Sequence, residues 1–240
     1  MEMVVFIFSI LNHVFLYKYE EGKGVRVEKL LEKVFLEGKK AVQNIVFDLG
    51  RVLIDYDPQT FLDSLFGRTF DTNKLKPVVF QSPEWAMLDR GVINQVQAVE
   101  RLGNQYPELA EHIRIVFDNW FSMLTPIESS VEWVTRLHKQ GYSLYVLSNF
   151  HREAFSYVRG KYSWFQLFDG MVISYQVHAL KPEPAIYEAL LRMYQLEPES
   201  CLFIDDVLAN IEGAQQMGIK GIQYKNPEQM SRDLVEVLGR

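Results

Sequence analysis

Cysteine is nearly absent from this chain. Cys201 is the only cysteine among the 240 residues, so no disulfide bond can form within the chain. Stable disulfides are typical of oxidising compartments, and their exclusion favours a reducing, cytoplasmic location.

The chain also has no excess of positively charged residues. The 25 lysines and arginines are outnumbered by 31 aspartates and glutamates, which gives a formal net charge of −6. Nucleic acids and anionic membranes are bound mainly through positively charged surfaces, so the composition speaks against both as partners. With 48% hydrophobic residues, the chain can bury a sizeable core, as one domain with an insert or as two small domains.

The sequence also lacks a hydrophobic run long enough to predict a membrane-spanning helix. Residues 4–17 come closest, but Asn12 and His13 interrupt them, and the basic start and cleavage site of a signal peptide are missing. Residues 27–35 show apolar side chains at helical spacing and predict an amphipathic helix. Residues 1–43 therefore form an N-terminal extension with three open explanations: sequence not native to the protein, packing on the rest of the chain or on a partner, or a membrane anchor.

Four short apolar runs end in polar side chains or are soon followed by them. Residues 45–47 precede Asp48, residues 144–147 precede Ser148, residues 171–174 precede Lys181, and residues 201–204 precede Asp205 and Asp206. Runs this short, separated by helical stretches, are typical of buried parallel strands, whose carboxyl ends face one crevice. Carboxylates, a hydroxyl and an ammonium group are thus expected to converge, which is the set of groups that phosphoryl transfer needs.

The remaining pattern predicts an α/β fold with a doubly wound, Rossmann-like parallel sheet. Helices are expected over residues 127–140, 152–161, 184–194, 207–217 and 227–238, and a last strand over residues 221–224. Residues 57–126, which we call the insert, are too long for a plain connection and show helical patterns over residues 61–66, 75–80, 92–102 and 109–124. The core is then expected to comprise residues 44–56 and 127–240.

These motifs resemble those of the haloacid dehalogenase-like hydrolase superfamily. Residues 48–53 look like its first motif, Ser148-Asn149 its second, Lys181-Pro182 its third, and Asp205-Asp206 with Asn210 its fourth. The resemblance spans roughly residues 44–240 and implies that the insert is the small helical cap of this superfamily. It also implies a Mg²⁺-dependent enzyme that hydrolyses a small-molecule phosphate ester.

The resemblance assigns a role to each motif. Asp48 would be the nucleophile, because attack of a carboxylate on phosphorus forms a mixed anhydride that water later cleaves. Its carboxylate would also bind Mg²⁺, together with the main-chain carbonyl of Gly50 and the carboxylate of Asp205. The Ser148 hydroxyl and the Asn149 main-chain N–H would donate to phosphoryl oxygens.

Three further residues complete the implied site. Lys181 would neutralise phosphate charge and position the nucleophile. Asp206 would act on the metal indirectly or through water, and Asn210 would hold the loop. For Asp206 and Asn210 the alternative is a role as caps of the following helix, which both residue types favour.

Gly50 departs from the superfamily pattern, which usually has a second aspartate at this position. That aspartate protonates the leaving group and then activates water, a contribution of roughly 10²–10⁴-fold. Superfamily members similar to this chain, with glycine here and a helical cap, include bacterial phosphatases that act on a sugar 1-phosphate, whose anomeric oxygen leaves readily. Without a substitute donor, we expect rates to fall steeply as the leaving group becomes more basic.

Several neighbouring residues are candidates for the missing contacts. Asp55, Asp57 and His151 are candidate proton donors, with solvated loop positions as the alternative. Arg51, Arg90 and Trp85 are candidates for contact with a sugar phosphate, with surface pairing or packing within the cap as the alternative.

Two other functions remain to be weighed. A 2-haloacid dehalogenase uses the same aspartate on carbon, but dehalogenases of this superfamily need no metal and lack the metal-binding acid of the fourth motif, unlike Asp205-Asp206 here. If the chain were a non-catalytic phosphate-binding or scaffold protein, Gly50 would be a sign that catalytic residues had been lost. Asp48, Ser148 and Lys181 are nevertheless all present.

Overall fold

The computed structural model describes residues 4–10, 13–19, 42–67 and 70–239. It divides the chain into two compact units, residues 1–40 and residues 41–240. The amphipathic helix predicted over residues 27–35 lies outside the described residues.

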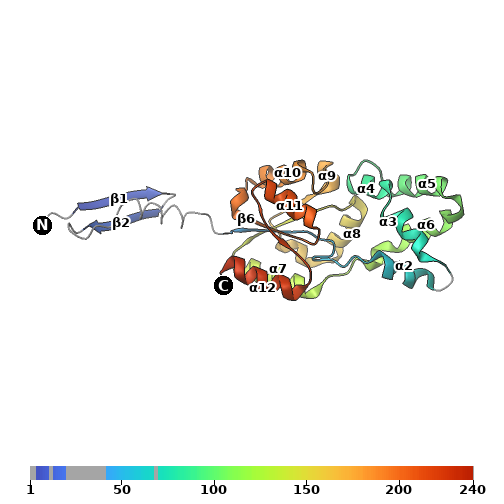
Figure 1. The fold of residues 1–240 in the computed structure, drawn as a ribbon, viewed down its shortest axis with the longest axis horizontal. Coiled ribbons are helices and arrows are strands. Elements are labelled where there is room, and N and C mark those ends of the chain that lie inside the picture. The colour runs from blue at the N-terminus through green and yellow to red at the C-terminus, as the bar shows by residue number, and fades with distance from the viewer. Residues whose placement is uncertain (1–3, 11–12, 20–41, 68–69, 240) are drawn as a thin grey trace. The chain divides into compact units, whose positions relative to one another are not determined.

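The first unit contains an antiparallel β-hairpin. Strand β1 (Val4–Ile10) pairs with β2 (His13–Tyr19) in a register that runs from Val4 opposite Tyr19 to Ile10 opposite His13 (Figure 1). The apolar residues at this end are mostly β-branched or aromatic, which suits strands better than a helix. None of the described helices is long and apolar enough to cross a membrane.

The second unit is built on a parallel five-stranded sheet in the order β5-β4-β3-β6-β7. Its strands are β3 (Asn44–Phe47), β4 (Ser143–Ser148), β5 (Gly170–Ile173), β6 (Cys201–Asp205) and β7 (Lys220–Gln223). Each strand lies within two residues of its predicted position, and β3 is central. The predicted α/β fold is confirmed.

Helices cover both faces of this sheet, so it is doubly wound. They are α7 (Glu128–Lys139), α8 (Arg152–Lys161), the short α9 (Ser174–Val177), α10 (Pro184–Tyr194), α11 (Leu208–Gln216) and α12 (Pro227–Leu238). Ile45 and Phe47 of β3 pack into the apolar cluster that α7, α8 and α12 share, while Val46 packs into the cluster of α10 and α11. Figure 1 shows α10 and α11 on one side of the sheet and α7 and α12 on the other.

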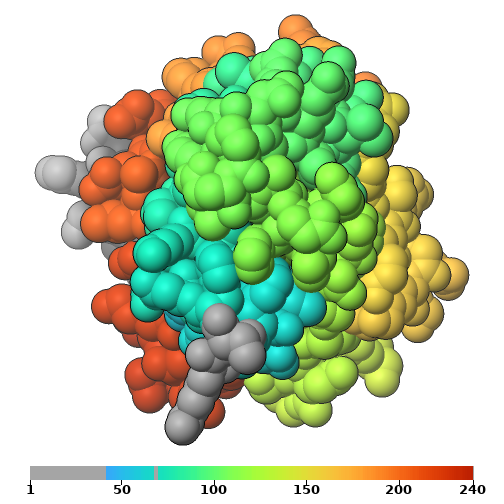
Figure 2. Space-filling model, turned by 90° about the vertical axis from the view of Figure 1, so that its right-hand side faces the viewer, coloured from blue at the N-terminus to red at the C-terminus, as the bar shows by residue number. Residues whose placement is uncertain are grey.

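The insert is helical, as predicted. It contains α2 (Pro58–Phe66), η2 (Thr72–Lys74), α3 (Leu75–Phe80), α4 (Pro83–Asp89), α5 (Gln95–Gln105), η3 (Pro107–Leu109), α6 (Ala110–Asn119) and η4 (Trp120–Met123). Figure 2 views the molecule from the side of the insert, whose teal-to-green surface covers most of that face. The insert's exact limits, residues 57 and 126, stay a prediction.

Helix α4 was not among the predicted elements. Pro83 was interpreted as a break between helical segments, but it lies in the first turn of a helix, and Ser82 Oγ accepts a hydrogen bond from the Trp85 main-chain N–H at 3.1 Å. The next helix, α5, begins at Gln95 rather than at residue 92, because Asn94 and Gln97 form a capping box.

Candidate active site

Three polar side chains of the candidate site stand at the ends of three adjacent strands. Phe47 of β3 is paired with Val146 of β4 on one side and with Ile204 of β6 on the other. The polar residues one or two positions further along these strands are therefore close together: Asp48, Ser148 and Asp205, all three of them buried. The sheet register brings Ser148 close to Asp48, although the two are 100 residues apart in the sequence.

Lys181 links the two carboxylates of this set. Its Nζ lies 2.7 Å from Asp48 Oδ1 and 2.6 Å from Asp205 Oδ2, and its side chain is only 1% exposed. Burial on its own would lower the pKa of Lys181, but Asp48 and Asp205 outweigh it and raise that pKa above the ordinary value. The ammonium group is therefore charged at neutral pH, and it holds the two carboxylates together.

Ser148 completes the contacts of the central carboxylate. Its hydroxyl donates a hydrogen bond to Asp48 Oδ1 at 2.6 Å. Burial raises the pKa of Asp48 to about 7, against the lowering effect of Lys181, and the nearby charge of Asp205 raises it further. Lys181 alone therefore does not offset the cost of burying the ionised form of Asp48.

Two asparagines fix the loops around this centre. The Asn149 side chain accepts a hydrogen bond from the Lys181 main-chain N–H at 2.8 Å and donates one to the Lys181 carbonyl at 3.1 Å. Asn210 Nδ2 donates to both carboxylate oxygens of Asp205 at 3.0 Å. The cap position of α11 is Val207, with no side-chain capping bond, so Asp206 and Asn210 do not cap that helix.

The carboxylates form a plausible metal centre. Oxygen atoms of Asp48, Asp205 and Asp206 lie within 4.8 Å of one another. Burial, and then the charge of Asp205, raises the pKa of Asp206, while Arg51 approaches it at 3.8 Å from the solvent side. An all-oxygen set with excess negative charge fits Mg²⁺, which prefers carboxylates and retained waters.

A pocket opens above Asp48 and has walls from both regions. Asp48, Gly50, Tyr56, Asn149, Phe150 and His151 line it from the core, and Trp85, Asp89 and Trp120 line it from the insert. His151 is enclosed by two tryptophans, with its ring centroid 4.6 Å from that of Trp85 and 4.8 Å from that of Trp120. The wall that the insert contributes is thus largely aromatic.

A family model described as haloacid dehalogenase-like hydrolase matches residues 42–218. The chain belongs to this family. A sesquiterpene phosphatase from Aspergillus oryzae is 25% identical to it over 197 residues, which cover 81% of this chain and 95% of that relative. A D-ribitol-5-phosphate phosphatase from Bacteroides thetaiotaomicron is 23% identical over 207 residues, which cover 82% of this chain and 98% of that relative.

Solved structures support the fold. A haloacid dehalogenase-like enzyme from Bacteroides thetaiotaomicron, in complex with magnesium and inorganic phosphate, superposes with a TM-score of 0.63 at 24% sequence identity. The match covers 77% of this chain and 95% of that chain. Family membership makes this protein a hydrolase.

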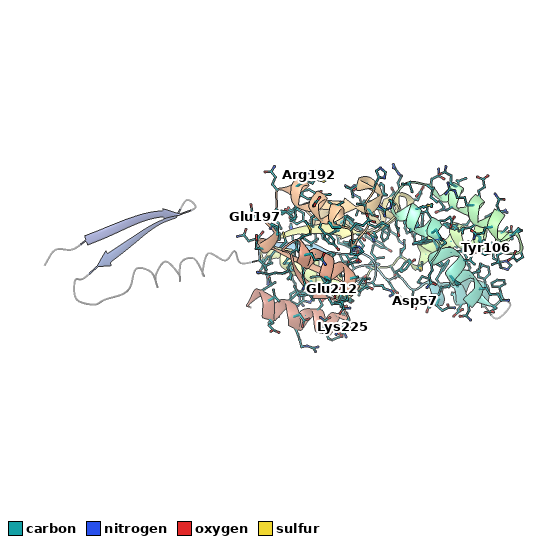
Figure 3. All side chains as sticks on the ribbon, turned by 45° about the horizontal axis from the view of Figure 1, so that its top comes forward. Asp57, Tyr106, Arg192, Glu197, Glu212 and Lys225 are labelled. Atoms are coloured by element: carbon teal, nitrogen blue, oxygen red, sulfur yellow. The ribbon has the colours of Figure 1, made fainter. Side chains whose placement is uncertain are left out.

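Three residues that the sequence suggested for proton transfer or substrate contact do not line this pocket. Asp57 lies at the boundary between core and insert (Figure 3), where its Oδ1 accepts hydrogen bonds from the first main-chain N–H groups of α2, so it caps that helix. Asp55 is exposed and outside the pocket lining. Arg90 pairs with Glu183, which is the surface pairing considered as the alternative to substrate contact.

Asp89 is a pocket residue that the sequence did not reveal. It stands at the end of α4, the helix that was not predicted, and its side chain is 17% exposed. Burial, followed by the charge of Asp48, raises the pKa of Asp89 to about 8, and Lys181 opposes the shift. The one available signal was the cap sequence Ser82-Pro83 before an apolar stretch, which marks the start of a helix.

Proposed function

We propose that this protein is a Mg²⁺-dependent phosphatase that hydrolyses a small phosphomonoester, with a sugar phosphate as the leading substrate class. The reaction proceeds through a phosphoaspartyl intermediate on Asp48. The observation that carries the proposal is the buried arrangement in which Asp48 and Asp205 share the Lys181 ammonium group while Ser148 binds Asp48.

Each residue has one task in this reaction. The carboxylate of Asp48 attacks phosphorus, and its rotation is fixed because Ser148 and Lys181 both contact Oδ1. In the complex, Ser148 and the Asn149 main-chain N–H donate to phosphoryl oxygens, and Lys181 balances the charge that the phosphoryl group brings. Asn149 and Asn210 keep Lys181 and Asp205 in place through the hydrogen bonds described above.

Asp48, Asp205 and the main-chain carbonyl of Gly50 would hold the metal ion, with Asp206 nearby. Mg²⁺ supplies positive charge that lets two anions, the nucleophile and the phosphate, approach each other. The crowding of three carboxylates around one lysine supports this assignment, because the site needs another cation to be neutralised.

The substrate class is supported by the relatives and by the pocket. Two full-length relatives are named as phosphatases, one of them acting on ribitol 5-phosphate. Trp85 and Trp120 give the pocket flat apolar surfaces, which suit the carbon face of a small sugar or polyol. We also assign the protein to a reducing, cytoplasmic compartment, in keeping with the single, buried and unbridged Cys201.

The two alternatives fit the site less well. A dehalogenase would have no use for Asp205 and Asp206 beside the nucleophile, whereas their oxygens lie within metal-binding distance of Asp48. A scaffold protein would have no need of the hydrogen bonds that Asn149 and Asn210 make to the charged centre.

The test is phosphate release from a panel of sugar, polyol and aryl phosphates, with Mg²⁺ and with a chelator. We expect release only with Mg²⁺, and none from the Asp48→Asn variant. Chloride release from 2-chloropropionate without metal would favour the dehalogenase, and binding of phosphate esters without turnover would favour the scaffold.

A further inference from the structure

The position of the missing second aspartate is open space. A Cβ atom built on Gly50 would have no heavy atom within 4 Å, and the φ of Gly50 is outside the left-handed region. Residue 50 therefore has no side chain that could donate a proton. A donor has to come from another part of the pocket lining, which offers Tyr56, Asp89 and His151 as titratable groups besides Asp48.

Two of these three groups neither donate nor accept a proton readily at neutral pH. Burial between the tryptophans lowers the pKa of His151 to about 3, so its ring is neutral and does not take up a proton. Burial raises the pKa of Tyr56 far above its ordinary value, so the phenol neither releases nor exchanges its proton readily. Asp89 is the group that remains.

The end of α4 is anchored on the core, and this anchoring places Asp89. Its main-chain carbonyl accepts a hydrogen bond from Ser174 Oγ of α9, and the same oxygen of Ser174 accepts one from the Phe150 main-chain N–H at 3.0 Å. Arg90 donates to the His178 carbonyl at 3.0 Å and pairs with Glu183. Asp89 is thus held by its neighbours in the chain, while its side chain faces the pocket.

We propose that Asp89 of the insert takes over the task of the absent aspartate: it protonates the leaving oxygen and then accepts a proton from the attacking water. This inference rests on the proposed phosphatase function. The neutral imidazole of His151 lies beside this carboxyl group, with its Nε2 3.7 Å from Asp89 Oδ1.

The proton balance closes over the two half-reactions. In the first, a bond forms between Asp48 and phosphorus, the bond from phosphorus to the leaving oxygen breaks, and the proton of Asp89 passes to that oxygen to give the alcohol. In the second, water attacks phosphorus, its proton returns to Asp89, and the bond from phosphorus to Asp48 breaks to release phosphate. Asp89 ends as it began, in the protonated form.

The surroundings of Asp89 suit a carboxyl group that is protonated at neutral pH. The groups that face it are Asp48, Lys181, Tyr56 and His151. Burial and the charge of Asp48 disfavour its ionised form, Lys181 is a weaker opposing influence, and the other two groups are uncharged at neutral pH. A raised pKa near the working pH is what proton transfer in both directions requires.

The test compares leaving groups. We would measure kcat/KM at saturating Mg²⁺ for para-nitrophenyl phosphate, phenyl phosphate and ethyl phosphate, which differ in the basicity of the leaving oxygen. In the unmodified protein we expect only a shallow fall along the series, and for ethyl phosphate a loss of rate above about pH 8, where Asp89 ionises.

Asp89→Asn should lower kcat/KM for ethyl phosphate by roughly 10²–10⁴-fold and remove the loss of rate above pH 8. For para-nitrophenyl phosphate, which needs no proton, we expect a loss of less than about tenfold. Asp118→Asn, at an exposed carboxylate of the same insert, is the matched control and should leave all three rates unchanged. In the double variant Gly50→Asp with Asp89→Asn, the restored carboxylate should recover part of the rate with ethyl phosphate.

Several results would overturn the inference. A steep dependence on leaving-group basicity in the unmodified protein would show that no donor acts. An equal loss for all three substrates in Asp89→Asn would mean a role in binding or packing. Failure of the unmodified protein to release phosphate from any of the three with Mg²⁺ is a different result, because it would reject the proposed function itself.

Discussion

The two walls of the pocket place different groups beside their carboxyl groups. At the carboxyl ends of β3 and β6, which we call the sheet edge, Asp48 and Asp205 share the ammonium group of Lys181 at 2.7 and 2.6 Å. On the side of the insert the wall is aromatic, and Asp89 has a neutral imidazole at 3.7 Å. Ion pairing favours charged forms, whereas an apolar wall favours neutral ones.

This contrast indicates a division of tasks between core and insert. We assign attack, metal binding and phosphate binding to the sheet edge, where the charge of Lys181 lies against both Asp48 and Asp205. The insert provides a carboxyl group that can change its charge within the reaction, close to where a leaving group would lie. Each wall can be tested by a substitution that affects one task and spares the other.

The largest effect is expected at the sheet edge. Asp48→Asn removes the attacking anion and little volume, so turnover should fall by at least roughly 10⁴-fold while the fold is retained. Steady-state phosphate release and thermal unfolding measure the two properties. Activity near that of the unmodified protein would reject Asp48 as the nucleophile.

Asp205→Asn should weaken the metal site first. Loss of a residue that only hydrogen-bonds to a metal ligand typically costs about 10–100-fold in metal affinity or activity. For loss of a direct ligand we therefore expect the rate at low Mg²⁺ to fall by more than about 100-fold, and part of this rate to be recovered at high Mg²⁺. Asp206→Asn is the matched comparison and should shift the Mg²⁺ titration less. An Asp205→Asn variant with lost rate but unchanged Mg²⁺ dependence would contradict direct ligation.

Gly91→Ala should affect the insert side alone. Gly91 has a φ of +72°, and an added Cβ would lie 2.6 Å from the Tyr175 carbonyl oxygen, so the end of α4 has to move away from α9. The left-handed backbone adds about 1–3 kcal/mol of strain. We expect a lower Tm and a selective loss with basic leaving groups, whereas the Mg²⁺ titration stays as it was. A shift of the Mg²⁺ titration as large as the loss in rate would mean that the two walls are not independent.

The smallest effect is expected from removing residues 1–40. They form a unit separate from residues 41–240, and every residue of the candidate site lies in the second unit. The shortened chain should fold and keep its kcat/KM, which thermal unfolding and the same phosphate assay can check. Loss of the thermal transition together with activity would show that the first unit is required by the core.

The sheet-edge part of the site could be predicted because strand ends leave a clear pattern in the sequence. Asp48 and Ser148 each come directly after a short apolar run, and their convergence then follows from parallel strands alone. The contribution of the insert could not be predicted in this way. Asp89 is the last residue of α4, whose first residue, Pro83, was interpreted as a break, and its proximity to the pocket depends on how α4 packs against α9.

The hairpin shows a related difficulty at the other end of the chain. Residues 4–17 are apolar enough to fit several kinds of segment. They are rich in β-branched and aromatic side chains, which favour strands, but this composition alone does not predict a hairpin. Local composition did not determine the pairing of β1 with β2, since antiparallel register is decided by contacts across the two strands.

Ser174 joins three segments of the chain through its hydroxyl group. Its hydroxyl binds the Asp89 carbonyl of the insert and the Phe150 main-chain N–H, which adjoins Asn149 and His151 in the pocket lining. If the insert swings outward to admit substrate, this junction opens and Asp89 leaves the nucleophile. Asp48 would then be open to solvent only while Asp89 is distant. Asp89 would be in place to transfer a proton only while the insert is closed over Asp48.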